Sequence, residues 1–376
     1  MQSATSITRD LVAIPSVNPM GRPVSGGIYS EMKVAGYVQS YLGSFGVKSE
    51  LFGADPLHPN LVAFIDAGCS ETVMLEAHMD TVPHDGMTVD PFDPVIIDGK
   101  LYGRGSCDTK ASLATYLHAI GSAVSHGRKL TRNIVLAAVH DEEYAFTGSR
   151  ELVERNIGAT FAVVGEPTSL DIVYAHKGYC RFFITTRGKT AHSATPWLGS
   201  NAIYSMAGVI NRIREYGEVL TESADPMLGS ATVNVGRIMG GDAVNVVPGS
   251  CSIEIDRRLL PGQTYQQVRL ELESLLADVD ADLTIEDAYM VAPAVCADKD
   301  GIGCQSLLRA CQQTGRHPLF KTAHFATDAS ILTGAGIPSL VFGPGDVAMA
   351  HTEDEYISVD EIEKAAEIIL NLISEP

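Results

Sequence analysis

The sequence predicts an α/β protein, with a mostly parallel sheet covered by helices on both faces and a smaller α+β domain inserted into it. Nearly continuous apolar runs of strand length alternate with helical patterns, as in NLVAFI (60–65), KASLATYLHAIGSAVSHG (110–127) and NIVLAAV (133–139). Strands of this composition are typical of a parallel sheet buried on both sides. The pattern changes from about Gly178 and returns near residue 290, which indicates the insertion.

The larger domain can be followed element by element. Residues 4–14 are expected to form a helix that stops at Pro15, and residues 28–46 a second helix. The helix at 110–127 ends at a glycine. The remaining elements expected in this domain are the strands TVMLEA (72–77), FAVVGE (161–166) and PSLVFG (338–343), the helix 302–313 and a C-terminal helix from about 359.

The inserted segment reads as strand, helix, strand, strand, helix, strand. This is the order of a split βαβ, ferredoxin-like domain. Its elements are RFFITTRG, the helix 201–217, ATVNVGRI, SCSIEIDRRL, the helix 264–279 and ADLTIEDA. We therefore expect a discontinuous catalytic domain at 1–177 and 290–376, interrupted by a second domain at 178–289.

Composition limits the partners and the compartment. The 27 Lys and Arg against 46 Asp and Glu give a net charge of −19, which argues against nucleic acid or an anionic membrane as the main partner. No apolar run reaches the length of about 18 residues that a membrane span needs, and the start lacks the apolar core of a signal peptide. The seven cysteines are scattered, without a CxxC pair, so a disulfide framework is not expected. A cytoplasmic enzyme fits best.

Histidines and acids follow the expected strands at the points where they end. Ligands of open α/β sheets bind outside the carboxyl ends of the strands. One acidic residue at such a position is commonly a solvated surface group, but several strand ends carry such residues here. They are His78 and Asp80 after the strand 72–77, Glu142 and Glu143 after 133–139, Glu166 at the end of 161–166, His351 after 338–343, and Asp108 in the glycine-rich loop before the helix 110–127.

These donors predict a metal site. Imidazole nitrogens with carboxylate oxygens suit zinc or a similar divalent ion, and more acids are present than one ion needs, which favours two ions sharing a carboxylate. His78 and Asp80 lie two residues apart, so on an extended chain the acid can hold the second imidazole nitrogen. By the same alternation Glu142 and Glu143 point apart, so one could bind metal while the other acts on water.

Other catalytic motifs are missing from the sequence. It contains no G-x-S-x-G nucleophile elbow and no G-x-x-x-x-G-K-[ST] phosphate loop. The segment GRGSCD (103–108) shares only its first two glycines with a dinucleotide fingerprint. These competing chemistries therefore fit the sequence less well than a metal site does.

Several ordered motifs resemble the M20 family of metallopeptidases and deacylases, and they extend over nearly the whole chain. Some later segments are most similar to the branch of this family that removes acyl groups from amino acids. The motifs are EAHMDTVP (76–83), YGRGSCDTKAS (102–112), HDEE (140–143), GEPT (165–168), RGKTAHSA (187–194), DRRLLPG (256–262) and AHTEDE (350–355).

The resemblance implies a zinc-exopeptidase-like catalytic domain and assigns roles residue by residue. His78 and Glu166 would hold one zinc ion and Glu143 and His351 the other. Asp108 would bridge both ions, with a cis peptide often following it. Asp80 would orient His78, and Glu142 would be the general base. Zinc is expected, with cobalt or manganese as alternatives.

The resemblance also assigns roles to the inserted domain, as a lid and as the surface of a homodimer. His192 would reach the reacting carbonyl, in its own subunit or across the dimer. Arg258 and Asn245 would contact the substrate carboxylate. From the residues alone, Arg258 would be a surface strand residue and His192 a loop histidine.

The expected reaction is hydrolysis of the amide of a small N-acylated amino acid. The metal motifs equally serve an exopeptidase or carboxypeptidase acting on small peptides, and N-succinyl substrates remain open. A third hypothesis is a non-catalytic binding or assembly protein. Such a relative would have lost the base or a ligand, whereas every one of these positions is filled here.

Overall fold

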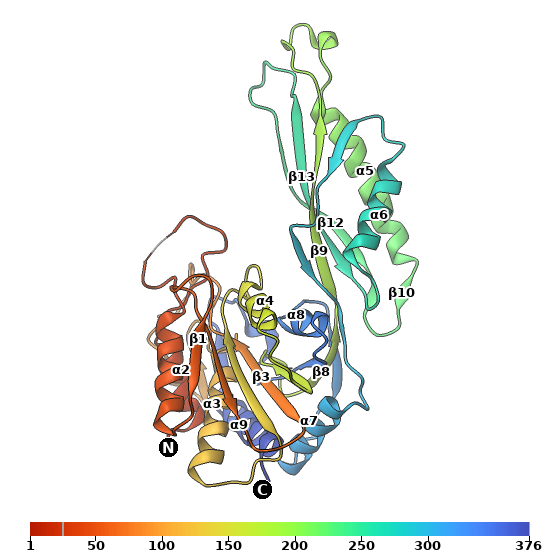
Figure 1. The fold of residues 1–376 in the computed structure, drawn as a ribbon. Helices are drawn as coiled ribbons and strands as arrows, with labels where there is room; N and C mark the ends of the chain where they lie inside the picture. The colour runs from red at the N-terminus through yellow and green to blue at the C-terminus, as the bar shows by residue number, and fades with distance from the viewer. Residues whose placement is uncertain (25, 376) are drawn as a thin grey trace. The chain divides into compact units, whose positions relative to one another are not determined.

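The computed structural model describes residues 1–24 and 26–375 and divides into two compact units (Figure 1). The first unit comprises Met1–Tyr174, Ala297–Lys321 and Thr327–Pro376, and the second comprises Ala175–Cys296 and Thr322–Ala326. The segment 178–289, expected from the sequence to be an inserted domain, falls within the second unit.

The first unit is built around a sheet with the strand order β1-β2-β6-β3-β7-β18-β8. The neighbours β6, β3, β7 and β18 are parallel, whereas β1, β2 and β8 run antiparallel to their neighbours. The strands are β1 (Ser49–Phe52), β2 (Asn60–Ile65), β3 (Thr72–His78), β6 (Asn133–Val139), β7 (Phe161–Val164), β8 (Ile172–His176) and β18 (Ser339–Val341). The predicted α/β class with a mostly parallel sheet is confirmed, and antiparallel strands at its edges are added to it. Two further strands, β16 (Val295–Cys296) and β17 (Phe320–Ala323), pair with β8.

Helices cover both faces of this sheet, and every residue of β6 is therefore buried. Helices α1, α3, α7 and α9 pack against one another on one face, while α4 and α8 pack together on the other (Figure 1). The helices of this unit are α1 (Ala4–Val12), α2 (Met32–Ser44), α3 (Lys110–Ser125), α4 (Thr147–Glu154), α7 (Ile302–Gln313), α8 (Ala329–Gly334) and α9 (Val359–Ile373), with the short 3-10 helix η2 (Val347–Met349).

A small antiparallel sheet ties the C-terminal segment to the loop before α3. In it β5 pairs with both β4 and β19, so residues near 356 lie beside residues near 102. This pairing brings the segment around residue 356 to the glycine-rich loop that carries Asp108. Its strands are β4 (Val95–Ile97), β5 (Lys100–Tyr102) and β19 (Tyr356–Ser358).

The second unit has the predicted ferredoxin-like order of strand, helix, strand, strand, helix, strand. Its antiparallel sheet runs β12-β13-β9-β14, and β15 also pairs with β9. One face packs on α5 and α6 around a core that includes Phe182, Met206 and Ile253. The elements are β9 (Gly178–Arg187), η1 (Pro196–Leu198), α5 (Ala202–Thr221), β10 (Ala224–Asp225), β11 (Gly229–Ser230), β12 (Thr232–Gly240), β13 (Ser250–Leu259), α6 (Tyr265–Leu276), β14 (Asp282–Ile285) and β15 (Met290–Ala292).

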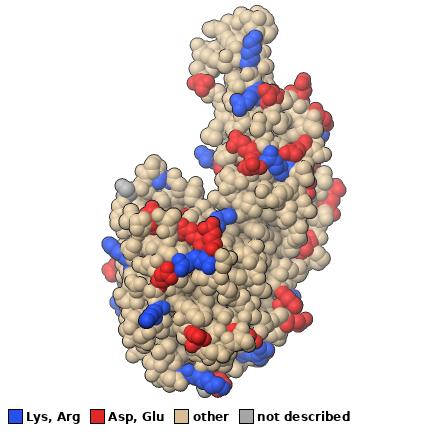
Figure 2. Space-filling view, in the orientation of Figure 1, with Lys and Arg blue, Asp and Glu red and all other residues tan. Residues whose placement is uncertain are grey.

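On the face drawn in Figure 2, basic and acidic residues occur in small mixed groups. Among the described residues, no helix combines the length and the apolar character needed to cross a membrane.

Candidate metal centre

The predicted ligands of the first unit gather at one edge of the central sheet. His78 is the last residue of β3, Glu142 and Glu143 follow β6, and Glu166 follows β7. Because these strands are parallel neighbours, their carboxyl ends meet at the same edge. His351, which follows η2, is brought to the same place.

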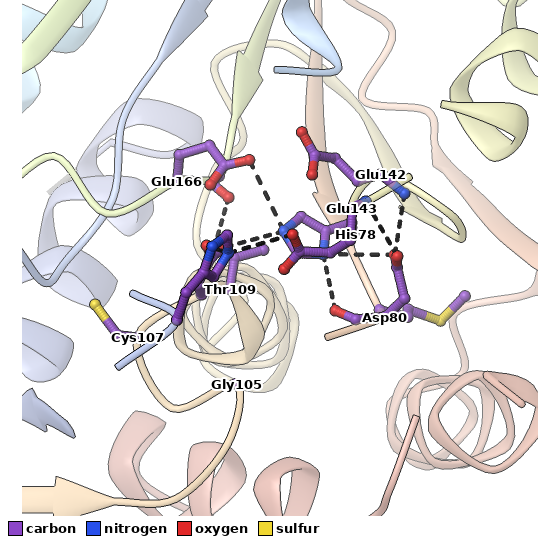
Figure 3. A network of polar contacts seen from close by, with 12 residues as sticks. His78, Asp80, Gly105, Cys107, Thr109, Glu142, Glu143 and Glu166 are labelled. Carbon is purple, nitrogen blue, oxygen red and sulfur yellow. Dashed lines mark hydrogen bonds and ion pairs between the residues drawn. The ribbon is translucent and has the colours of Figure 1, made fainter. Parts of the chain in front are cut away.

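Asp108 lies between the two imidazoles and contacts both. Its Oδ1 is 3.1 Å from Nε2 of His78, and its Oδ2 is 3.1 Å from Nε2 of His351. The His351 Nε2 is also 3.2 Å from Oε2 of Glu143, and the His78 Nε2 is 3.8 Å from Oε1 of Glu166. The donors therefore form two halves that share one carboxylate. In Figure 3, Glu166 and Asp80 lie on opposite sides of the His78 ring.

The donor set fits divalent cations. Ligand atoms of His78, Asp108 and Glu143 lie within 4.8 Å of one another, as do those of His78, Glu142 and Glu166. Among the described residues, the buried Oε1 of Glu143 has no hydrogen-bond partner. A buried carboxylate oxygen without a partner is costly, and a bound cation removes that cost. Nitrogen and oxygen donors in this number suit zinc and similar divalent ions.

The electrostatics of the site also favour a bound cation. Burial, and then the charge of Glu166, raise the pKa of the Glu142 carboxyl well above its ordinary value. Burial and the nearby Asp108 do the same to the pKa of Glu166. Hydrogen bonds to Asp108 and Glu143 raise the pKa of His351 to about 10. The cluster thus holds more negative charge than its imidazoles can balance, a situation that divalent ions relieve.

Asp80 contacts both a predicted metal ligand, His78, and the turn that carries Glu142 and Glu143. Its Oδ1 lies 3.5 Å from Nδ1 of His78, and that nitrogen also lies 2.9 Å from the Asp80 backbone oxygen. The backbone N–H groups of Glu142 and Glu143 donate to the Asp80 carboxylate, each at 3.2 Å. Asn18 donates a further bond of 2.8 Å. The sequence indicated the contact with His78 but not those with the backbone after β6.

Asp141, which the sequence left without a role, shapes the turn that carries the glutamates. It adopts a left-handed conformation with φ of 63°, and its backbone oxygen accepts the N–H groups of Ala145 and Phe146. Its carboxylate accepts hydrogen bonds from Asn18, at 2.9 Å, and from the Thr147 hydroxyl. Asn18 donates to both Asp80 and Asp141 and thereby links these two acids. A left-handed aspartate that bonds to nearby groups is tolerated.

Glu355 organises the loop that presents Asp108, and sequence reasoning assigned it no role. Its Oε1 accepts the backbone N–H groups of Cys107, at 2.8 Å, and of Asp108, at 3.0 Å. Its Oε2 accepts the Gly105 N–H at 3.0 Å and pairs with Arg104 at 2.7 Å. The only signal in the sequence was its place in the AHTEDE motif. A cis peptide joins Asp108 to Thr109, as the family resemblance implied.

His192 and Asn245 lie together in the second unit, on neighbouring loops. A backbone bridge joins His192 to Val246, and the Ser193 N–H donates to the backbone oxygen of Asn245 at 3.0 Å. Both side chains are exposed. The His192 Nδ1 accepts the Ala194 N–H at 3.1 Å, which leaves its Nε2 as the outer nitrogen of the ring.

Arg258 and its neighbour Arg257 occupy opposite faces of β13. The Arg257 side chain is fully buried and bonds to the Tyr216 hydroxyl at 3.2 Å, so its environment is structural. Arg258 is half-buried and pairs through Nε with Asp256 at 2.9 Å. Arg181 pairs with the same carboxylate, also at 2.9 Å. Arg258 is therefore held in place by a shared acid on the sheet surface.

Comparisons with known proteins identify the family of this chain. The family model described as peptidase family M20/M25/M40 matches residues 74–375. An acetylornithine deacetylase of Myxococcus xanthus is 33% identical over 354 residues, covering 90% of each chain. An M20 family metallo-carboxypeptidase of Sulfolobus solfataricus has a similar fold, with a TM-score of 0.79 at 20% identity over 99% of this chain and 98% of that one.

A Bacillus subtilis protein, described as a dinuclear metal binding peptidase from the M20 family, also shares the fold. Its TM-score is 0.71 at 17% identity, with 98% of this chain and 96% of that chain covered. The family match spans far more than half of the sequence and includes the residues that gather around Asp108. The chain therefore belongs to peptidase family M20/M25/M40 and is a metal-dependent hydrolase.

Proposed function

We propose that this hydrolase uses two divalent metal ions to cleave the amide of a small N-acyl amino acid, with acetylornithine as the first substrate to test. The observation that carries the two-metal arrangement is the position of Asp108, whose two oxygens each lie 3.1 Å from a different imidazole. The choice of an acylated amino acid is supported by the Myxococcus xanthus relative, an acetylornithine deacetylase that is 33% identical to this chain.

In this proposal His78 and Glu166 would hold one ion, Glu143 and His351 the other, and Asp108 both. Zinc is the first candidate, and cobalt and manganese are alternatives with the same donor preferences. When bound, such ions supply a Lewis acid and lower the pKa of water.

Glu142 moves the proton. It takes a proton from the attacking water as the water oxygen bonds to the acyl carbon, and it returns that proton to the amine nitrogen as the C–N bond breaks. The products are a carboxylic acid and a free amino acid. Burial raises the Glu142 pKa, and a raised pKa lets one carboxyl both accept and donate a proton near neutral pH. Asp80 supports this step because it binds the Glu142 backbone N–H.

The second unit supplies recognition. His192 would donate a hydrogen bond to the oxygen of the reacting carbonyl, where negative charge develops. Arg258 and Asn245 would bind the free carboxylate of the amino acid, for which a guanidinium is well shaped. The exposure of His192 and Asn245 supports a role in contacting substrate, since neither side chain is needed for a core.

We also propose a cytoplasmic homodimer formed through the second unit. In support, β12 is an edge strand, and several large apolar side chains of this unit are exposed: Trp197, Leu198, Tyr204, Ile238, Met239 and Val244. Exposed apolar groups of this density are typical of interaction surfaces. Light scattering on the purified protein tests the dimer.

Activity assays decide the substrate. Acetylornithine, other N-acetyl amino acids, N-succinyl amino acids and a dipeptide panel should be compared by kcat/KM with zinc, cobalt or manganese added. The acyl amino acids are expected to exceed the dipeptides by at least about tenfold, a difference of roughly 1.4 kcal/mol in transition-state binding. A preference for dipeptides would instead support an exopeptidase or carboxypeptidase, the activity named for the Sulfolobus solfataricus structure.

A further inference from the structure

A small pocket with two arginines in its lining lies at the opposite end of the central strands from the metal centre. It has a volume of about 210 Å³ and lies wholly within the first unit; we call it the Arg132 pocket. Its polar lining includes Arg132, Ser306, Arg309, Gln313, Asn371 and Glu375. Arg132 directly precedes β6, whereas Glu142 and Glu143 follow the end of that strand. Seven residues of strand separate the two regions, roughly 20 Å at about 3.3 Å per residue.

Arg132 is a buried cation with unused hydrogen-bonding capacity. Only 8% of the residue is exposed, and its guanidinium lies over the Phe161 ring, 5.4 Å from the centroid. Its Nη2 donates weakly to the Ser306 hydroxyl at 3.4 Å and lies 3.6 Å from Glu71. Within residues 1–24 and 26–375, its buried Nε and Nη1 have no hydrogen-bond partner. A buried guanidinium left in this state costs free energy.

Arg309 brings a second guanidinium to the same place. Its Nη2 donates to the Ser306 hydroxyl at 3.2 Å, so two cations converge on one neutral oxygen. The side chain is exposed, and no ion pair of Arg309 occurs in the described part of the chain. Burial lowers the pKa of Arg132, and the Arg309 charge lowers it further. Like charges that share a neutral partner are stabilised by an anion placed between them.

The acids near the pocket are already engaged or solvated. Glu375 lines the pocket, but its Oε1 pairs with the Lys129 ammonium at 2.6 Å. The Glu71 side chain is 39% exposed and lies 3.6 Å from only one edge of Arg132. Among the described residues, neither carboxylate forms an ion pair with both guanidiniums.

We propose that the Arg132 pocket binds a small oxyanion, a phosphate or a carboxylate, between Arg132 and Arg309. Planar guanidinium forks match the geometry of both anions, and the Ser306 hydroxyl with the Gln313 and Asn371 amides supplies further polar contacts. The volume admits an inorganic anion or a short carboxylate. Binding here stabilises the N-terminal end of β6. The site is separate from the metal centre, because the pocket contains none of the proposed metal ligands.

Binding can be measured on the metal-loaded enzyme by isothermal titration calorimetry and by thermal unfolding. The probes are inorganic phosphate, sulfate, acetate and succinate, each compared with chloride at equal ionic strength. Phosphate or sulfate alone raising Tm assigns the pocket to inorganic oxyanions, and acetate or succinate alone assigns it to carboxylates. If none of the four raises Tm more than chloride does, the proposal is wrong.

Variants separate this pocket from anion binding at the metals. Arg309→Gln removes an exposed side chain and is expected to weaken the Kd of the effective anion about tenfold or more, since hydrogen bonds to charged groups contribute roughly 1.5–3 kcal/mol. Arg9→Gln removes an exposed arginine of the same unit outside the pocket and should leave the Kd unchanged. An equal Kd in wild type and Arg309→Gln would place the anion elsewhere and overturn the proposal.

Discussion

The two units hold the side chains of the proposed site in different ways. In the first unit, His78, Asp80 and Glu166 are buried, and backbone donors from distant segments fix the carboxylates around them. In the second unit, His192 and Asn245 are exposed, and apart from the bond between the His192 ring and the Ala194 N–H, the contacts described for their loops are between backbone groups. Only Arg258 is held by another side chain, Asp256.

This difference in burial and contacts is the one expected between a rigid catalytic site and a surface that adapts to its substrate. A site that places charge must be rigid before substrate arrives, because reorganisation during the reaction costs rate. Groups that meet the substrate can remain solvated until it binds. Substitutions in the first unit should therefore change both metal binding and turnover, with the proposed base as the exception, while those in the second unit should change turnover or KM alone.

The largest effect is expected for Glu142→Gln. Loss of the proposed base should lower kcat by about 10³–10⁴-fold, while metal analysis by mass spectrometry still finds the wild-type content. Glu142 also lies close enough to His78 and Glu166 for the three side chains to hold one metal ion together. If metal is lost together with activity, Glu142 is a ligand and the proposed division between the glutamates is wrong.

His192→Ala tests the second unit at nearly the same scale. Removal of one hydrogen bond to the developing oxyanion is expected to lower kcat by about 10²–10³-fold. Metal content and thermal stability should not change, because the side chain is exposed. Ser193→Ala, at the adjacent exposed position, is the control and should retain wild-type kcat. Equal activity of the two variants would remove the second unit from the chemistry.

Asp80→Asn should affect metal binding and catalysis together. Asp80 contacts His78 and the backbone of both Glu142 and Glu143, and loss of such support around a metal ligand typically costs about 10–100-fold in affinity or activity. Zinc affinity can be measured by competition with a chelator, alongside kcat. A variant that loses activity but keeps its zinc affinity would show that Asp80 supports the base alone.

Arg258→Lys is expected to raise KM about tenfold with little change in kcat, because lysine cannot form a bidentate contact with a carboxylate. Arg181→Lys is the matched control, since Arg181 pairs with the same Asp256 carboxylate. Steady-state kinetics on the proposed substrate distinguish the two. A similar rise in KM in both variants would show that the cluster is structural.

The smallest effect on catalysis, none at neutral pH, is expected for His176→Gln in the second unit. Burial lowers the pKa of His176 to about 4, from an ordinary value of 6.5. Below pH 6.5 the unfolded chain therefore takes up a proton at His176 more readily than the folded chain does. The free energy of unfolding is unaffected by this residue above pH 6.5 and falls as the pH is lowered towards 4, by at most about 3 kcal/mol. Urea unfolding between pH 4 and 7 should show a shallower acid dependence in His176→Gln. The exposed His317→Gln should match the wild type, and a wild-type slope in His176→Gln would contradict the assignment.

The place of the proposed metal ligands could be predicted from the sequence, because parallel pairing of the strands that they follow is enough to bring them together. His78, Glu142 and Glu166 each follow a short apolar run, and parallel pairing of those runs needs no further information to collect them at one edge. The direction of β2 was not readable, since an apolar run is the same in either orientation. The short helix α4 and the polar strand β1 were missed because neither has a full hydrophobic period.

The supporting contacts were not predictable, because they join residues far apart in the chain. Asn18 reaches Asp141 across 123 positions, and Glu355 reaches the loop at Gly105 across 250. Their chemistry is ordinary for surface asparagine or glutamate, and only the folded chain shows which donors surround them. The left-handed backbone conformation of Asp141 likewise could not be predicted from the sequence, because it depends on the groups that surround the residue in the folded chain.

The dependence of Asp108 on Glu355 has a consequence for how the enzyme matures. The ribosome makes His78, Asp108 and Glu166 long before His351 and Glu355, so a growing chain presents the bridging loop without its carboxylate anchor and one half of the site without its imidazole. Both proposed metal positions would be complete only once the segment that carries His351 and Glu355 has been made and its strand β19 has paired with β5. Full metal loading is therefore expected only after synthesis has passed this segment.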